Sequence, residues 1–307
     1  MKKWFLQIWR RFKLNFGIII RMSCTWTGAV YAVLGFLAMF SSLESVFEQF
    51  GITTFWCKLL VSVGILAGVF LICFVVAAVV VLRKKQVKVL EGVDGHSVYV
   101  VYGDLFDAHI VPSGTKRRNV CFAVNRCFDT VVDNKLISDE TLHGKAFKTL
   151  YDNGSFTPAS LDSAIQASII QGAKYKTLTD KQKPAGNLKR YEVGTGADLE
   201  ISQSLHYFLI GIGKMNENLK NKAENGEYCQ AIQKMIEFFD TFSQGYPVLM
   251  PIVGAGLTRL GQDPSVLLKY LIQSFVLNKS HLSSDVYIVL REEDRDKISI
   301  AKLKQNK

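Results

Sequence analysis

Two long uncharged apolar segments constrain the fold of this 307-residue chain more than any other feature. Residues 22–43 and 59–82 contain no charged side chain. As helices they would be roughly 33 and 36 Å long, enough to cross a hydrocarbon core of about 30 Å. Two buried core helices are the alternative, but runs of this length are typical of membrane spans. A signal peptide does not fit, because the first run is too long and a second follows closely. We predict a transmembrane helical hairpin over residues 22–88.

The positive charge of the chain is concentrated beside these segments. The formal net charge is +10, and residues 1–21 carry six basic side chains and no acid, while Arg83, Lys84, Lys85 and Lys88 flank the second segment. From residue 89 onward, 26 basic residues are balanced by 25 acidic ones. The charge therefore indicates a membrane surface as partner, and no nucleic acid. Because basic flanks stay cytoplasmic, both termini are expected in the cytoplasm.

Residues 1–21 are predicted to form a basic amphipathic juxtamembrane segment. Its apolar residues recur at helical spacing, which favours a helix in the headgroup plane: Phe5, Ile8, Trp9, Phe12 and Phe16. An ordinary basic flank with chance aromatics is the alternative. Small residues in the two spans offer positions for close helix contact, with a GxxxG pair at 64 and 68, although glycine is common in membrane helices: Gly28, Gly35, Gly64 and Gly68.

Residues 89–290 alternate between strand-like and helix-like runs. The expected strands are rich in Val, Ile, Tyr and Phe and cover 96–103, 119–125, 205–213, 247–254 and 285–290. The expected helices cover 160–171, 227–242 and 265–277, the last capped by Asp263 and begun by Pro264. This order predicts one α/β domain, a mixed sheet flanked by helices. Residues 291–307 are expected to be a charged tail with little to bury.

The six cysteines are scattered and form no CxxC pair, so neither a disulfide framework nor a metal site is expected. That usage agrees with a reducing cytoplasm.

Three loops that leave the expected strands are candidates for ligand binding, because α/β sheets bind ligands beyond the carboxyl ends of their strands. They are "YGDLFD" after the first strand, "VNRCFD" after the second and "VGAGLTRLG" after the fourth. Small residues at 254–256 allow backbone N–H groups to approach a phosphate closely. A plain strand-to-helix turn is the alternative, and no Walker sequence GxxxxGK[ST] occurs.

Taken in order, these loops resemble those of a macro domain, the α/β fold that binds ADP-ribose. "YGDLFD" resembles the family's "GDI" element, "NVCFAVN" the strand before "VNAAN", "LHGKAF" (142–147) the first glycine loop, and "PIVGAGLTRLG" the second phosphate loop. The resemblance covers roughly residues 95–290, as a macro-like domain within 89–290. With the preceding hairpin, the whole chain is similar to the transmembrane macro effectors of Thoeris anti-phage systems.

The resemblance implies a set of ligand-binding residues. Asp104 would accept a hydrogen bond from the adenine amine, with the Leu105 backbone beside it, and Asn125 would lie near the distal ribose. The first phosphate loop would include His143 and Gly144, although its run of glycines is reduced to one. The second loop would hold the phosphates through backbone N–H groups, with its last position facing the distal ribose: Gly254, Ala255, Gly256, Leu257 and Thr258. Plainer roles are a turn residue for Asp104, a strand-end cap for Asn125 and a surface histidine for His143.

One departure from the family pattern bears on catalysis. Phe128 stands where hydrolytic macro domains have the second asparagine of "VNAAN", and a phenyl ring cannot orient an attacking water. Asp129 is a conceivable base, but nothing marks a partner acid. No catalytic residue and no cofactor are therefore expected.

The resemblance implies a receptor in a bacterial inner membrane. It would sense a TIR-made ADP-ribose derivative, such as histidine-ADP-ribose, and then self-associate to disrupt the membrane lipids. A membrane-anchored ADP-ribosyl hydrolase and a tethered scaffold without ligand are the alternatives.

Overall fold

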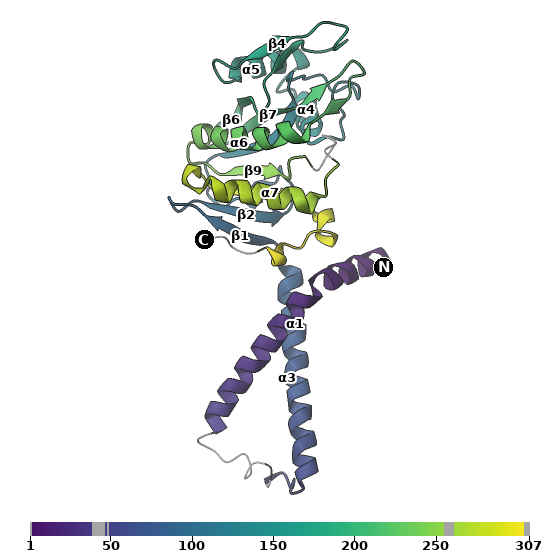
Figure 1. The fold of residues 1–307 in the computed structure, drawn as a ribbon, viewed down its shortest axis with the longest axis vertical. Coiled ribbons are helices and arrows are strands. Elements are labelled where there is room, and N and C mark those ends of the chain that lie inside the picture. Colours follow the sequence, from purple (N-terminus) through teal and green to yellow (C-terminus); the bar gives the residue numbers. More distant parts are fainter. Residues whose placement is uncertain (1, 39–46, 48, 255–260, 304–307) are drawn as a thin grey trace. The chain divides into compact units, whose positions relative to one another are not determined.

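The computed structural model describes residues 2–38, 47, 49–254 and 261–303, which divide into two compact units. One unit comprises the N-terminal helices through Lys85 together with the segment Arg295–Leu303, and the other comprises Gln86–Asp294. Figure 1 shows the helical elements and the α/β elements that make up these units.

The helical unit contains α1 (Lys2–Ala38) and α3 (Phe55–Arg83). Both are long and apolar enough to cross a membrane. Most of their large apolar side chains are exposed, for example Leu60 at 70% and Ile72 at 67%. A core-helix role within this unit is therefore excluded for the described residues, because core helices bury such side chains. Residues 39–43 of the first expected span lie outside the described residues.

The basic segment and the first expected span form one continuous helix, α1, whose N-terminal part bends away from the rest in Figure 1. Close packing between α1 and α3 involves an aromatic group, in which the rings of Phe12 and Phe16 lie edge-on to Phe74 at 6.0 and 6.4 Å. Beside them Ile19 and Ala77 are fully buried. The contact thus lies near the end of α3 that carries Arg83.

The segment after the sheet is not the free charged tail expected from its sequence. It contains the 3-10 helices η3 (Glu292–Asp296) and η4 (Ile300–Lys302). Ile298 and Ile300 are 6% and 2% exposed, and Ala301 packs against the α1–α3 contact. We call residues 295–303 the C-terminal strap. The segment is rich in charged residues, so its composition predicts an exposed tail and gives no sign that these two isoleucines are buried.

Polar contacts fix the strap to both helices. Arg11 Nε lies 2.8 Å from Asp296 Oδ1, and the Ser299 hydroxyl donates to the Asn15 side chain. Arg295 Nη2 donates to the carbonyls of Leu82 and Lys84, each at 3.3 Å. A cation at the last carbonyls of α3 satisfies groups that have no partner within the helix.

The second unit is built on an eight-stranded mixed sheet in the order β1-β2-β10-β9-β3-β7-β6, with β8 paired to β7. The strands are β1 (Gln86–Glu91), β2 (Ser97–Tyr102), β3 (Arg118–Asn125), β6 (Gly196–Ser202), β7 (Leu205–Met215), β8 (Asn221–Lys222), β9 (Val248–Pro251) and β10 (Val286–Leu290). The five central strands β2, β10, β9, β3 and β7 are parallel. β1 and β6 pair antiparallel at the two sides, and a separate hairpin joins β4 (Tyr175–Thr177) to β5 (Lys189–Tyr191).

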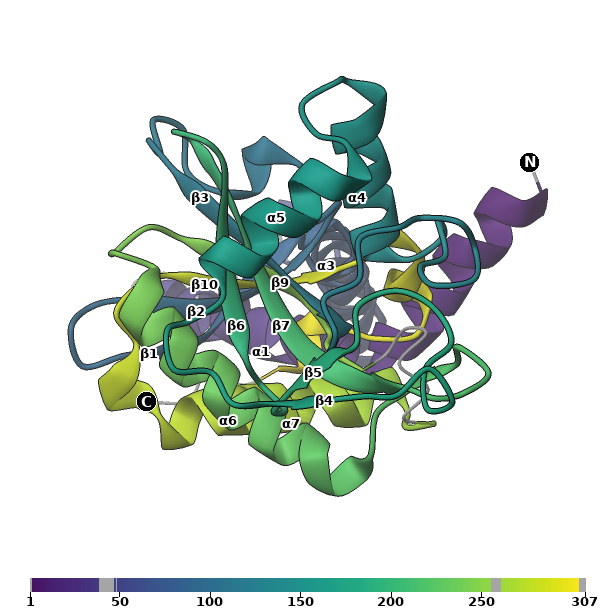
Figure 2. The same ribbon diagram turned by 90° about the horizontal axis from the view of Figure 1, so that it is seen from above.

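Helices cover both faces of the sheet, as Figure 2 shows. One face carries α4 (Leu142–Asp152) and α5 (Pro158–Ser168), and the other carries α6 (Asn225–Phe242) and α7 (Pro264–Leu277). Neighbouring residues of β7 point to opposite faces: Phe208 packs on Phe238 of α6 at 5.1 Å, while Leu209 joins the core cluster under α4 and α5. The expected α/β class with helices on both faces is confirmed.

Local capping signals mark the starts of α7 and α5. Asp263 Oδ1 accepts from the Ser265 amide at 2.7 Å and Pro264 occupies the first turn of α7, as expected. Thr157 and Ser160 form a reciprocal capping box at the start of α5. The largest core contact of α4 is Phe147, which is fully buried and worth roughly 2–3 kcal/mol of transfer free energy.

Candidate functional site

The candidate site lies at the edge of the sheet where its parallel strands end. Asp104 and Leu105 follow β2, Asn125 is the last residue of β3, and Gly254 follows β9. Since these three strands run parallel in one sheet, their carboxyl ends share one edge. The Gly103 amide continues the ladder by donating to the Leu290 carbonyl at 2.8 Å.

Asp104 is exposed and shapes the turn after β2. Its Oδ1 accepts from the Phe106 amide at 3.0 Å, and its carbonyl accepts from the Asp107 amide at 3.0 Å. No further hydrogen bond reaches its carboxylate within the described part of the chain. Leu105 is 4% exposed and anchors the turn in the core. Asp104 is thus a turn residue, and its Oδ2 can still accept a hydrogen bond from another group.

Asn125 is 2% exposed and caps the end of β3. Its Oδ1 accepts from the Cys127 amide at 2.9 Å, and its carbonyl accepts from the Phe128 amide at 3.0 Å. The tight turn brings Phe128 to φ +51°, a left-handed conformation that is rare for bulky residues. Backbone in this region is associated with sites that the surrounding structure must hold in place.

Phe128 is a core residue. Its ring is 1% exposed and meets Tyr191 of β5 edge-on at 5.6 Å between centroids. The position that the resemblance aligns with an asparagine of hydrolytic macro domains is thus a packed core ring in this chain.

Asp129 forms a buried ion pair. Its Oδ1 lies 2.9 Å from Lys183 Nζ and accepts from the Asn187 amide at 2.7 Å. Lys183 is fully buried and also donates to the carbonyls of Ala185 and Asn187 at 2.6 and 3.0 Å. Burial raises the pKa of Asp129, against the opposing effects of Lys183 and the Asn187 amide. The ion pair and the Asn187 amide thus satisfy Oδ1, while Oδ2 is buried without a hydrogen-bond partner among the described residues.

The segment that carries Lys183 is fitted closely around this carboxylate. Gly186 has φ +78°, and a Cβ there would lie 2.2 Å from Asp129 Oδ1. Asn187 extends the network, because its side-chain amide donates to Asp162 Oδ1 of α5 at 2.6 Å. The network pins the segment 179–188 beside the turn that follows Asn125. Sequence reasoning missed Lys183, since the run "TDKQKPAGN" reads as an exposed loop.

His143 and Gly144 lie in the first turn of α4, where a glycine loop was expected. The Gly144 amide donates to the capping hydroxyl of Thr141 at 3.0 Å, so it is already used within the chain. A Cβ at Gly144 would lie 2.1 Å from the Ser138 carbonyl oxygen. Close packing therefore requires a glycine at this position. His143 is half-buried and edge-on to Phe147 at 5.9 Å. Burial lowers the pKa of His143 to about 4, so its imidazole is neutral at pH 7.

The second expected loop begins at Gly254, which is buried with φ +87°, a conformation that favours glycine. Ala255, Gly256, Leu257 and Thr258 lie outside the described residues. The Tyr228 hydroxyl of α6 donates to the Val253 carbonyl at 2.9 Å and holds the start of the loop. Burial raises the pKa of the Tyr228 phenol. No sequence signal marked Tyr228, which reads as one more apolar residue of a helix.

No group of three or more potential metal ligands from His, Cys, Asp and Glu occurs among the described residues. All six cysteines are free.

The mixed sheet with helices on both faces has a macrodomain-like architecture, and two apolar N-terminal helices precede it. The family model described as "Thoeris protein ThsA, Macro domain" matches residues 98–291. The chain therefore belongs to the ThsA macro domain family.

Individual relatives extend the similarity beyond the matched domain. The chain is 26% identical to the Thoeris protein ThsA of Bacillus amyloliquefaciens over 255 residues, which cover 81% of this chain and 80% of that relative. Among solved structures, an Oceanobacillus iheyensis macrodomain variant aligns at TM-score 0.40 and 11% identity, covering 72% of this chain and 96% of its own. The Mycobacterium tuberculosis DarG macrodomain aligns at TM-score 0.31 and 14% identity, covering 62% and 97%.

Proposed function

We propose that the chain is a ThsA-type effector of Thoeris defence that binds an ADP-ribose derivative at the carboxyl edge of its sheet. The observation that carries the proposal is the convergence of Asp104, Asn125 and Gly254 on that edge. The free oxygen of Asp104 would accept from the adenine amine, and the loop from Gly254 through Thr258 would offer backbone N–H groups to the diphosphate. The first turn of α4, with His143, is the expected second wall.

The site favours binding over hydrolysis. Phe128 is packed into the core, and Asp129 is held by Lys183, so neither is suited to activate water. A receptor has no need of such a group. We therefore rank a membrane-anchored ADP-ribosyl hydrolase below a receptor that releases its ligand unchanged.

The proposed output is disruption of the bacterial inner membrane by self-association. The apolar surfaces of α1 and α3 are exposed, and their basic flanks support a topology with both termini cytoplasmic. A Cβ at Gly64 or Gly68 would meet nothing within 4 Å, so this GxxxG pair is not used in the described α1–α3 contact. It is available for close contact with a second copy. The ligand would favour assembly by binding the assembled state more tightly than the free one.

Calorimetry of the full chain in nanodiscs tests the ligand part of the proposal. We expect histidine-ADP-ribose or ADP-ribose to bind stoichiometrically, with chromatography recovering it unchanged. Turnover of the ligand would support the hydrolase instead. The absence of both binding and turnover would support a tethered scaffold without ligand. Dye leakage from liposomes that carry the full chain tests the output. Leakage that is equally strong without ligand would contradict the proposed trigger.

A further inference from the structure

A pocket lies at the edge of the sheet opposite the candidate functional site. Arg118, the first residue of β3, lines it, whereas Asn125, the last residue of the same strand, belongs to the candidate site. The seven steps between these residues correspond to roughly 23 Å along an extended strand. This pocket, which we call the Arg118 pocket, is therefore separate from the edge that carries Asp104 and Gly254, and its role does not rest on the function proposed above.

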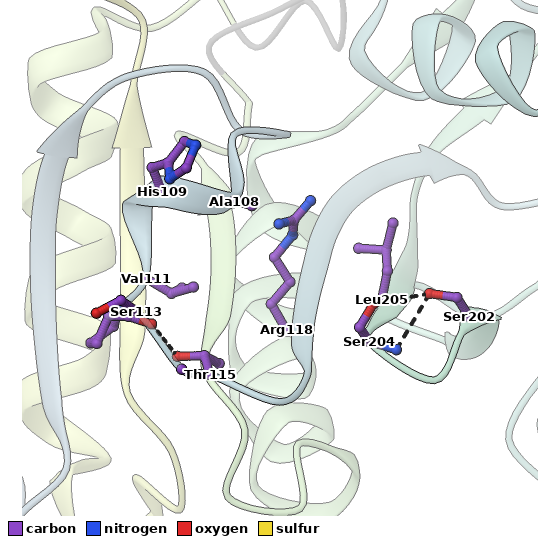
Figure 3. Close-up of a pocket in the computed structure, with 11 residues that line it drawn as sticks. Ala108, His109, Val111, Ser113, Thr115, Arg118, Ser202, Ser204 and Leu205 are labelled. Carbon is purple, nitrogen blue, oxygen red and sulfur yellow. Dashed lines mark hydrogen bonds between the residues drawn. The ribbon is translucent and has the colours of Figure 1, made fainter.

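Two segments enclose the Arg118 side chain. One runs from the 3-10 helix η1 (Ala108–Ile110) through the loop before β3, and the other is the turn between β6 and β7. Figure 3 shows Arg118 standing between these walls, with Ser113 and Thr115 on one and Ser202 and Ser204 on the other. The volume of about 490 Å³ lies within the range of small-molecule sites, roughly 300–1,000 Å³.

The guanidinium of Arg118 is incompletely satisfied. Its Nη2 donates to the Phe106 carbonyl at 3.1 Å, but its Nε is buried and has no hydrogen-bond partner among the described residues. Two other arginines near the ends of β3 have acidic neighbours: Arg117 lies 3.8 Å from Asp198, and Arg126 lies 3.1 Å from Glu227. None of the ion pairs between described residues includes Arg118. Because Nε is closed to solvent, a ligand in the pocket would meet the N–H groups of Nη1, from which no hydrogen bond to a described residue leaves.

We infer that the Arg118 pocket binds the phosphate group of a small molecule or of a lipid headgroup. None of its lining residues is acidic, and Arg118 supplies the charge together with a planar fork of N–H donors. Four hydroxyl groups line the same pocket: Thr115 donates to the Pro112 carbonyl at 2.7 Å, and those of Ser202 and Ser204 lie 3.3 Å apart. Polar groups on two walls suit a tetrahedral group, whose oxygens accept hydrogen bonds from several directions, better than a flat carboxylate.

Hydrogen exchange of the full chain in phosphatidylcholine nanodiscs tests this inference. Inorganic phosphate and pyrophosphate are titrated, and protection is followed in peptides that cover 106–118 and 202–205. We expect saturable protection of both peptides, and an apparent Kd about tenfold weaker in Arg118→Gln, in line with loss of one charge-assisted hydrogen bond. Arg118→Lys, which keeps the charge but loses the fork, should fall between the two.

Lys116→Gln is the matched control. It removes the same charge two residues away, from an exposed side chain that does not line the pocket, and should leave the apparent Kd within about twofold. Peptides around Asn125 report the other edge of the sheet, so phosphate bound at the candidate functional site is recognised separately. Those peptides should respond equally in wild type and Arg118→Gln.

A second arm identifies the source of the phosphate group. Nanodiscs that contain phosphatidylinositol phosphate are compared with phosphatidylcholine discs, without soluble phosphate. Protection in the first discs alone assigns the pocket to a lipid headgroup, whereas protection by inorganic phosphate in phosphatidylcholine discs assigns it to a soluble molecule. Absence of protection in both arms would overturn the inference, as would protection of equal strength in Arg118→Gln.

Discussion

Arg11 of α1 and Asp296 of the C-terminal strap form an ion pair at 2.8 Å, with side chains that are 24% and 13% exposed. Residues 285 positions apart in the chain are thereby joined within one unit. The pair stands beside the hydrogen bond from Ser299 to Asn15 and the contacts of Arg295 with the end of α3. The strap therefore fastens α1 to α3 at the base of the hairpin.

Asp296→Asn should loosen this fastening. Loss of the charge leaves Arg11 with a weaker partner, at a cost of about 1 kcal/mol for a partly exposed pair. We expect faster hydrogen exchange in peptides that cover residues 8–16 and 295–303. Lys13→Gln, which removes an exposed neighbouring charge, is the control. Equal exchange in the two variants would show that the ion pair does not hold the strap.

Asp104→Ala should weaken binding of an ADP-ribose derivative by about 1–3 kcal/mol, because an adenine hydrogen bond is lost. Asp107→Ala is the control, since Asp107 is exposed in the same loop and caps only the short helix η1, through the His109 amide at 2.9 Å. Calorimetry with both variants measures the difference. An unchanged affinity in folded Asp104→Ala would remove Asp104 from the site.

His143 should make stability depend on pH. The unfolded chain binds a proton at this residue below pH 6.5, whereas the folded chain does so only near its lowered pKa of about 4. Stability is therefore fully present above 6.5 and is lost as the pH falls toward 4, by at most about 3 kcal/mol. Urea midpoints at several pH values, followed by tyrosine circular dichroism, measure the loss. His143→Gln should flatten the dependence of stability on pH between 4 and 6.5. An unchanged dependence would show that the folded chain does not lower the pKa of His143.

Lys183→Met should destabilise the macro unit by about 3–5 kcal/mol, because it leaves the Asp129 carboxylate buried without its cation. Removing both charges, in Lys183→Met with Asp129→Leu, should recover much of that loss. Lys181→Met, at an exposed neighbouring lysine, should have little effect. Urea unfolding of these variants, together with Asp129→Leu alone, measures the coupling between the two charges. Additive effects would show that the pair is energetically unimportant.

Gly64→Leu and Gly68→Leu should reduce ligand-dependent assembly and dye leakage while leaving the hairpin folded. A Cβ at either position meets nothing within 4 Å in the described chain, so we expect the main effect to come from contacts with other copies. Val75→Leu adds volume at another exposed position of α3 and serves as the control. Leakage that stays at the wild-type level in both glycine variants would exclude this face from the assembly.

The strands that are buried on both faces were predictable from the sequence, because short runs rich in Val, Ile and Phe favour buried strands over helices or loops. β6 was missed, since "GADLEIS" mixes glycine and acids, and it pairs only at the side of the sheet. The start of α4 was read as a glycine loop. Gly144 is needed there because the Ser138 carbonyl leaves no room for a side chain, which is a contact that the local sequence does not encode.

The candidate site was predictable where it depends on strand ends. Asp104 and Asn125 follow strands with strong patterns, so their common edge follows from the parallel order. The pairing of Lys183 with Asp129 spans 54 residues and joins two polar loops, for which periodicity gives no signal. Tyr228 was missed for a related reason, because its hydroxyl acts on a carbonyl 25 residues away.

The position of β10 has a consequence for how the chain is made. β1 and β2 are joined to the rest of the sheet only through β10, which lies between β2 and β9 and is the last strand of the chain. During synthesis the apolar helices therefore emerge long before the sheet can close, and the turn with Asp104 stays apart from the other residues of the candidate site. Pairing of such distant strands is slow. On the proposed function, a nascent chain would therefore commit its apolar helices to the membrane before its sheet could bind a ligand.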